Sequence, residues 1–477
     1  MRTIKFYLQF LMIVALLFSS CKIPQQAQQK PLLQMPGQFV GNNNTDTSGI
    51  AVIKWKEFFN DQYLTALIDT ALINNWDVQV ALQKIKQAQA DVLLNKAALK
   101  PVVDAALTPS VSKFGEYTMN SAGNKGTEIY KGQNIPTQLA DFFVGLQTSW
   151  EADLWGKLAN KRKAAVARFL ETAEGKNIVI TNLVADIAAA YFELQWYDQS
   201  LSIIDSTIDL QKNALSLAKV QKEAGAATAL GVKQFEAQLL SLNSMRLETV
   251  QEINITENAI NLMVGRYPQA IKRSTAPGNN LLSITKGAGL PSALLLNRPD
   301  IRQAAFELEA THADVKSARA AFYPSLNITA GLGLQAFKPG LLFNAASLTY
   351  NALGNLTAPL MNKMAIRAAF DKASSVQVEA MYDYQKAIVN GYVEVYNELL
   401  RIDNLQQLMT VKSQEVNTLV QSVEISGLLF QSSRANYLDI LFAQQAALQT
   451  KLQLAETRKD QLLAGVNLYK ALGGGWR

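Results

Sequence analysis

The sequence predicts a mixed α and β membrane protein, in which strands cross the membrane and very long helices continue beyond it. Three observations support this prediction. The chain repeats itself once, four segments alternate between apolar and small polar residues, and two proline-free stretches are far longer than the helices of a globular domain. Because both copies carry the same order of helix, strand, return strand and long helix, we expect one interleaved body.

The repeat is visible as similar motifs at similar spacing. The segment at 75–78 (NWDV) returns as 298–301 (RPDI), and each copy then reads as a helix that ends at a proline, Pro101 or Pro324. The predicted boundaries are 51–280 for the first repeat and 281–477 for the second.

The N-terminus has the pattern of an export signal. Basic residues precede an apolar run at 6–18, and small residues follow it. Cys21, the only cysteine of the chain, comes directly after them and resembles the acylated cysteine of a bacterial lipobox. We predict a signal peptide at 1–20 and a lipidated, extended tether at 21–50, whose composition leaves little to bury. The alternative is an ordinary secretory signal with an incidental cysteine.

Composition and charge exclude several classes of function. The formal charge of +6 is modest and is scattered along the chain, so we expect no nucleic-acid partner. No segment after the signal reaches the roughly 18 uninterrupted apolar residues of a spanning helix. His312 is the only histidine, and neither a Cys/His cluster nor a phosphate-binding loop is present. We therefore predict no enzyme, no metal and no cofactor other than a lipid on Cys21.

Four segments have the period of two that is typical of half-buried strands. From Leu326 to Ala336, for example, apolar or small residues alternate with Asn, Thr, Gly and Gln. One apolar and one polar face suit a transmembrane barrel, and because four strands cannot close one alone, the barrel must be shared between chains. A soluble β-sandwich is the alternative. The expected strands are about 102–113, 141–151, 325–337 and 346–356.

Two very long helical patterns follow the strands. The first covers about 158–223, and a helix of ~65 residues is on the order of 100 Å long, so it needs partners along its whole length. Small residues on several faces indicate side-by-side packing. Breaks near 225 and 432 predict helix-turn-helix tips, with Thr228 or Ser433 as the N-cap of the next helix.

Five motifs then follow one another in a characteristic order. They are 153–157 (DLWGK), 297–301 (NRPDI), 322–326 (FYPSL), 436–444 (NYLDILFAQ) and 468–476 (LYKALGGGW). With these motifs the chain resembles the outer-membrane factor lipoproteins, the TolC-like ducts of tripartite efflux systems. The resemblance covers nearly everything after the tether.

The resemblance implies a homotrimer with a twelve-stranded β-barrel, four strands per chain, continued by a long periplasmic α-helical barrel. It implies a passive exit duct for small toxic compounds or drugs, lipid-anchored in the outer membrane of a Gram-negative bacterium. The implied partners are a periplasmic adaptor (membrane fusion protein) and an inner-membrane transporter of the RND type. The alternatives are the exit duct of a type I protein-secretion system and a structural periplasmic lipoprotein.

The resemblance also implies functional residues near the tips. Leu438 takes the place of an apolar gate residue, and Phe442, one turn later, stands where some relatives carry an aspartate. We expect a mainly hydrophobic periplasmic aperture, with Asp439 pointing about 100° away from Leu438 on the helix. The alternative is that both apolar side chains pack against a neighbouring helix. The expected adaptor-docking residues are Gly225, Ala226, Ala227, Thr228, Gln431, Ser432, Ser433 and Arg434.

Overall fold

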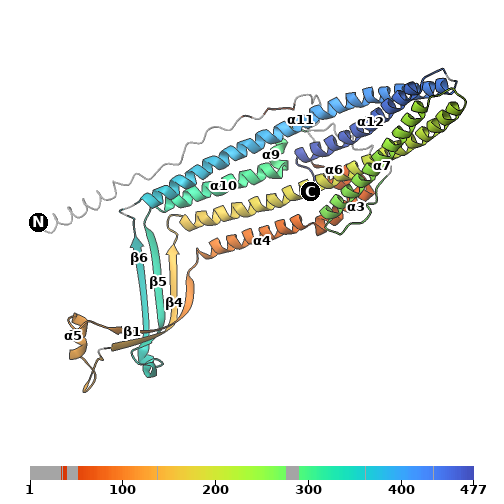
Figure 1. Cartoon of the computed structure of the whole chain (residues 1–477). Helices are drawn as coiled ribbons and strands as arrows, with labels where there is room; N and C mark the ends of the chain where they lie inside the picture. The colour runs from red at the N-terminus through yellow and green to blue at the C-terminus, as the bar shows by residue number, and fades with distance from the viewer. Residues whose placement is uncertain are drawn as a thin grey trace. The chain divides into compact units, whose positions relative to one another are not determined.

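The computed structural model describes residues 34, 36–39, 52–136, 138–274, 289–359, 361, 363–432 and 434–477 (Figure 1). The predicted signal peptide, Cys21, most of the tether and Ser433 lie outside these residues. The chain divides into two compact units that each draw on both repeats. The described part of unit 1 lies within 87–169 and 307–381, and that of unit 2 within 31–86, 170–306 and 382–477.

Unit 1 contains a four-stranded antiparallel sheet in the order β1-β4-β5-β6. The central pair joins a strand of the first repeat to one of the second, and β1 and β6 form the two edges. The strands are β1 (Val102–Lys113), β4 (Gln138–Ala152), β5 (Ser325–Ala336) and β6 (Leu348–Thr357).

The strand register gathers apolar side chains on one face of the sheet. Leu107 pairs with Val144, Val144 with Leu334, and Leu334 with Leu348, and directly paired residues point to the same side. We call this side the apolar face. Its apolar members include Val103, Ala105, Leu107, Val111, Phe142, Val144, Leu146, Trp150, Leu326, Ile328, Leu332, Leu334, Leu348, Tyr350 and Leu356.

The opposite side of the sheet, the polar face, carries mainly hydroxyl, amide and carboxylate groups. The same register therefore turns four weak alternating patterns into one amphipathic sheet. The polar members of this face include Asp104, Thr108, Ser110, Asp141, Gln147, Ser149, Asn327, Thr329, Gln335, Thr349, Asn351 and Asn355.

Between β1 and β4 the structure has a small lobe where the sequence predicted only a hairpin-like return. It consists of α5 (Met119–Gly126) and a two-stranded sheet of β2 (Glu128–Tyr130) and β3 (Gln133–Asn134). Thr118 caps α5 by accepting a hydrogen bond from the Ser121 amide at 3.3 Å. The lobe has no apolar periodicity, because its segments are too short and polar to bury a face. Two further turns, η3 (Pro339–Leu341) and η4 (Ala345–Ser347), separate β5 from β6.

Four α-helices contribute to both units, and the other α-helices of the described ranges, apart from α5 of the lobe, belong to unit 2. The shared helices are α4 (Trp76–Ala97), α6 (Lys157–Glu223), α10 (Pro299–Ala320) and α11 (Met364–Gln431). The helices of unit 2 are α2 (Trp55–Phe59), α3 (Gln62–Asn74), α7 (Ala229–Val264), η2 (Pro291–Ala293), α9 (Leu294–Asn297) and α12 (Tyr437–Ala471).

The main core of unit 2 is largely aliphatic and includes aromatic residues from distant segments. The ring of Phe58 stacks on that of Tyr469, with 4.1 Å between centroids, and both side chains are buried. Asp61 caps α3 with its carboxylate and also accepts a hydrogen bond from the buried Tyr191 hydroxyl at 3.0 Å. The core therefore joins the short N-terminal helices to α6 and α12.

Of the helices in the described ranges, α6 alone is long and apolar enough to cross a membrane by composition. Its most apolar 18-residue window has a mean hydropathy of 1.3, and half of that window is buried within the fold. Leu183, Ile187 and Leu194 of α6 are buried in the core of unit 2. The apolar residues of this helix thus contribute to packing within the chain.

Candidate functional site at the helical tips

The two long helices end in the same hydrogen-bond pattern. After α6, Gly225 adopts a φ of 73°, and the Ala226 amide donates to the Gln221 carbonyl at 2.7 Å. After α11, the Arg434 amide donates to the Leu429 carbonyl at 2.8 Å, which is the equivalent bond. This bond belongs to the Schellman ending of a helix, in which a left-handed residue frees the chain to reverse.

The caps of the returning helices differ from each other. Thr228 caps α7, as predicted, and accepts a hydrogen bond from the Gly231 amide at 3.2 Å. The prediction of Ser433 as the second N-cap is wrong, because Asn436 is the N-cap of α12. The backbone amides of Arg434 and Ala435 both donate to the Leu429 carbonyl of α11. Because these residues complete the end of α11, the next helix begins only after them.

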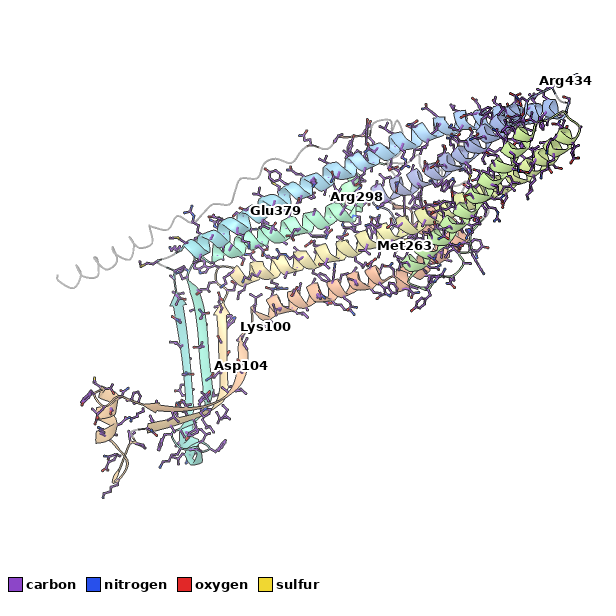
Figure 2. All side chains as sticks on the ribbon, viewed as in Figure 1. Lys100, Asp104, Met263, Arg298, Glu379 and Arg434 are labelled. Carbon is purple, nitrogen blue, oxygen red and sulfur yellow. The ribbon has the colours of Figure 1, made fainter. Side chains whose placement is uncertain are left out.

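The predicted adaptor-docking residues lie at the reversals of both hairpins. Figure 2 shows Arg434 at the end of the hairpin of α11 and α12. Of the docking residues within the described ranges, only Ala227 is half-buried, and the others are exposed. Their side chains and backbone are therefore accessible in the single chain.

Beneath the reversals, a small apolar cluster joins the two hairpins. Phe235 is fully buried, and its ring centroid lies 5.8 Å from that of Phe430. The Gln221 side-chain amide donates to the Phe430 carbonyl at 2.9 Å, which adds a polar link between the hairpins. We call this set the tip cluster, and its buried members are Ala214, Leu215, Ala218, Val232, Phe235, Phe430 and Ile440.

The three predicted aperture residues lie in the first turns of α12 but have different environments. Leu438 is half-buried, whereas Phe442 is 66% exposed. The Asp439 carboxylate accepts a hydrogen bond from the Asn436 amide at 2.9 Å and so helps to cap α12. The structure thus leaves the Phe442 ring uncovered by its own chain and gives Asp439 a local structural role.

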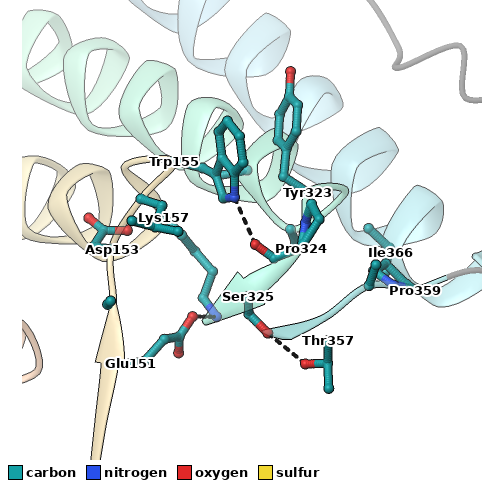
Figure 3. A pocket seen from close by; sticks show the side chains of 15 residues that line it. Glu151, Asp153, Trp155, Lys157, Tyr323, Pro324, Ser325, Thr357, Pro359 and Ile366 are labelled. Carbon is teal, nitrogen blue, oxygen red and sulfur yellow. Dashed lines mark hydrogen bonds and ion pairs between the residues drawn. The ribbon is translucent and has the colours of Figure 1, made fainter. Parts of the chain in front are cut away.

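Two of the sequence motifs meet where the strands of unit 1 pass into helices (Figure 3). The Trp155 indole N–H donates to the Pro324 carbonyl at 2.7 Å, and its ring stacks on Tyr323 with 4.8 Å between centroids. Beside them Lys157 and Glu151 form an ion pair of 2.6 Å. These residues line a cavity of about 380 Å³. Their contacts fix the junctions of β4 and β5 with the helices.

Another motif provides a buried guanidinium group. Arg298 donates to the carboxylates of Asp300 and Glu394 at 2.6 and 2.7 Å, and to the Ala471 carbonyl at 2.8 Å. Burial lowers the pKa of Arg298, but its bonds to Asp300 and the charge of Glu394 outweigh this effect and raise the pKa above its usual range. Arg298 therefore links α10, α11 and the end of α12.

The C-terminal glycine run has a role that sequence reasoning missed. Gly473 has a φ of 92°, and a Cβ added to it would lie 2.5 Å from the Asn297 carbonyl oxygen. The Trp476 indole N–H donates to that same oxygen at 3.2 Å. Gly473 is therefore needed where the end of the chain passes closely against the NRPDI motif, and a Cβ on Gly474 would lie 2.3 Å from the Tyr469 ring.

The lone histidine has an ordinary structural environment. His312 Nδ1 lies 3.0 Å from the Gln377 side-chain amide nitrogen. Burial, with a smaller contribution from the charge of Lys316, lowers the pKa of His312. Within the described ranges, no group of three His, Cys, Asp or Glu residues is placed to hold a metal ion.

Known proteins are similar to this chain in both sequence and fold. The chain is 28% identical to the cation efflux system protein CusC of Escherichia coli O6:H1, across 97% of this chain and 98% of that protein. It is 29% identical to the pyoverdine export outer membrane protein OpmQ of Pseudomonas aeruginosa, across 93% and 92%. Crystal structures of CusC match with a TM-score of 0.82 at 26% identity, across 95% and 100%.

These likenesses confirm the predicted mixed α and β fold of a TolC-like channel. Residues 67–266 and 290–474 match the family model described as outer membrane efflux protein, which accounts for most of the chain. The chain belongs to the outer membrane efflux protein family.

Proposed function

We propose that three copies of this outer membrane efflux protein form the passive exit duct of a tripartite RND-type pump. The observation that supports this most strongly is the open, amphipathic sheet. Its apolar face is exposed in the single chain, with Leu107 71%, Leu332 55% and Tyr350 82% accessible. Such a surface needs a lipid or protein covering, because it is large, continuous and apolar.

The edges of the sheet support sharing between chains. β1 and β6 are each paired on one side only, and an unpaired edge in hydrocarbon costs several kcal/mol per backbone group. In the proposal, β1 of one chain pairs with β6 of the next until twelve strands close the barrel. The apolar face then contacts lipid, and the polar face lines a water-filled bore.

The energy for transport comes from the proposed partners. The chain itself catalyses no reaction and needs no cofactor in this proposal. An inner-membrane transporter supplies the energy, and a periplasmic adaptor docks at the exposed tips around Gly225 and Arg434. A covalent lipid on Cys21 anchors each copy to the outer membrane.

We place the closure of the duct at Leu438 and Phe442. Phe442 is two-thirds exposed although it is a large apolar residue, which is expected if three copies contact one another across the bore. Asp439 is held in the cap of α12, so its charge acts mainly on that helix terminus. The closure is therefore mainly hydrophobic.

The family does not determine the cargo. One relative is named for cations and another for pyoverdine, so the cargo differs between similar chains. We propose small toxic compounds or drugs. Deletion of the gene should sensitise cells to such compounds, and loss of a secreted polypeptide without any new sensitivity would instead favour protein secretion.

The proposal is tested with the purified full-length protein. We expect a trimer that needs detergent to stay dissolved and that conducts ions in planar bilayers. A monomer that stays dissolved in plain buffer and never conducts would contradict the proposal. This result would support a structural periplasmic lipoprotein.

A further inference from the structure

The polar face of the four-stranded sheet carries a single aromatic side chain, that of Phe143 on β4. Its register partners are Thr108 on β1 and Gln335 on β5. The Gln335 amide donates to the Asp141 carboxylate at 2.6 Å, so polar groups lie next to the ring. A phenyl ring among hydroxyl, amide and carboxylate groups gains little hydrophobic stabilisation from its neighbours.

Two glycines lie beneath the ring, at a place where the backbones of β4 and β5 also leave no space for a Cβ. Gly145 and Gly333 are directly opposite each other in the register of β4 and β5. A Cβ added to Gly145 would lie 2.9 Å from Phe143 Cζ, and one added to Gly333 would lie 2.9 Å from Phe143 Cε2. The ring therefore lies over the glycine pair. Phe143 remains half-exposed, so part of its surface stays accessible on the polar face.

We propose that Phe143 is a cargo-contacting residue that favours planar aromatic groups. The inference rests on the proposed function, because that function directs the polar face toward the bore. Three copies in a trimer would present three such rings at the same height. Because the glycine pair lets the ring lie against the wall, the ring offers a stacking surface that leaves the bore open.

The competing explanation is that the ring only covers the two glycines, as aromatic residues do on other sheets. The two explanations differ in what a change at Phe143 does to a passing molecule. A stacking surface distinguishes a planar aromatic compound from a saturated compound with the same carbon skeleton, whereas a merely structural ring does not.

The test measures how two neutral probes, 2-naphthol and decahydro-2-naphthol, reduce the current through the full-length protein in planar bilayers. We compare the natural protein with Phe143→Leu, Phe143→Tyr and the matched control Phe142→Leu, which changes the adjacent phenylalanine on the apolar face. Phe143→Leu should weaken the apparent affinity for 2-naphthol by about 2- to 12-fold. Phe143→Tyr and Phe142→Leu should leave it within twofold.

The affinity for decahydro-2-naphthol should change little in every variant. Equal effects of Phe143→Leu on both probes, or no effect on either while the channel still conducts, would overturn the inference and leave the duct intact. If Phe143→Leu does not assemble, loss of the preference for 2-naphthol in Phe143→Met supports the inference, and its retention overturns it. Absence of conductance in the natural protein would contradict the proposed function itself, and the inference with it.

Discussion

Replacing Phe235 by alanine should loosen the helical tips without unfolding the rest of the protein. Phe235 is fully buried in the tip cluster, where residues of both hairpins surround it. This cluster is separate from the main core of unit 2. The lost packing should therefore appear as local opening of the hairpin ends, since stability varies from one part of a structure to another.

The magnitude follows from the burial of the ring. Truncation of a buried phenylalanine to alanine costs about 3–5 kcal/mol, which already includes the contact with the Phe430 ring at 5.8 Å. The neighbours Ala214 and Ala218 are too short to fill the space, whereas the larger Leu215 and Phe430 can partly close it, so the middle of this range applies. About 4 kcal/mol corresponds to a roughly thousandfold change in the local opening equilibrium.

Amide hydrogen exchange on the full-length protein in detergent measures this change. Protection of amides in the last turns of α6 and the first turns of α12 should fall by about a thousandfold, and protection in β4 and β5 should not change. The matched control is Leu240→Ala on the same helix, whose side chain is 70% exposed and should alter protection by less than about 0.5 kcal/mol. A loss below tenfold at the tips, or an equal loss in the strands, would refute the reasoning.

Three further predictions concern the aperture, the core and the buried arginine. Leu438→Ser combined with Phe442→Ser should increase the resting conductance in planar bilayers, and an unchanged conductance would show that these residues do not close the duct. Burial raises the pKa of Tyr469 to about 12 in the folded protein, from 10.0 for an exposed tyrosine. The folded state is therefore favoured by the neutral hydroxyl in full below pH 10, and this contribution is lost as the pH rises through 12. Tyr469→Phe should make alkaline denaturation less steep in that range, and an identical pH profile would contradict the assignment. Arg298→Lys should lower the free energy of unfolding by about 2 kcal/mol in denaturant titrations, because lysine cannot bond to both carboxylates at once. The loss is limited because both carboxylates are partly exposed and can be hydrated in the variant. A loss below about 0.5 kcal/mol would show that Arg298 is not a link of this kind.

The sequence was most informative where periodicity is long and regular. The alternation from Leu326 to Ala336 predicted a strand, and its register partners on β4 and β6 extend the same apolar face. Alternation could not reveal the pairing of β4 with β5, because that contact joins distant parts of the chain. Phe143 was likewise missed, since its environment depends on Gly333 of the other repeat.

Short local features were harder to predict. The lobe of α5, β2 and β3 has too few residues for a detectable period. Serine is a common N-cap residue, which favoured Ser433, but the hydrogen bonds that end α11 shift the cap to Asn436. The role of Asp439 in that cap follows from the position of Asn436, so it could not be assigned before the helix start was known.

The orientation of the sheet is tested most directly by the environment of single nitroxide labels along β5 in reconstituted membranes. Labels at Leu326, Ile328, Leu332 and Leu334 should collide with oxygen dissolved in the lipid, and labels at Asn327, Thr329 and Gln335 should collide with a water-soluble nickel complex. Alternation with a period of two is the predicted result. Equal exposure of both sets to the aqueous complex would contradict a membrane-spanning barrel.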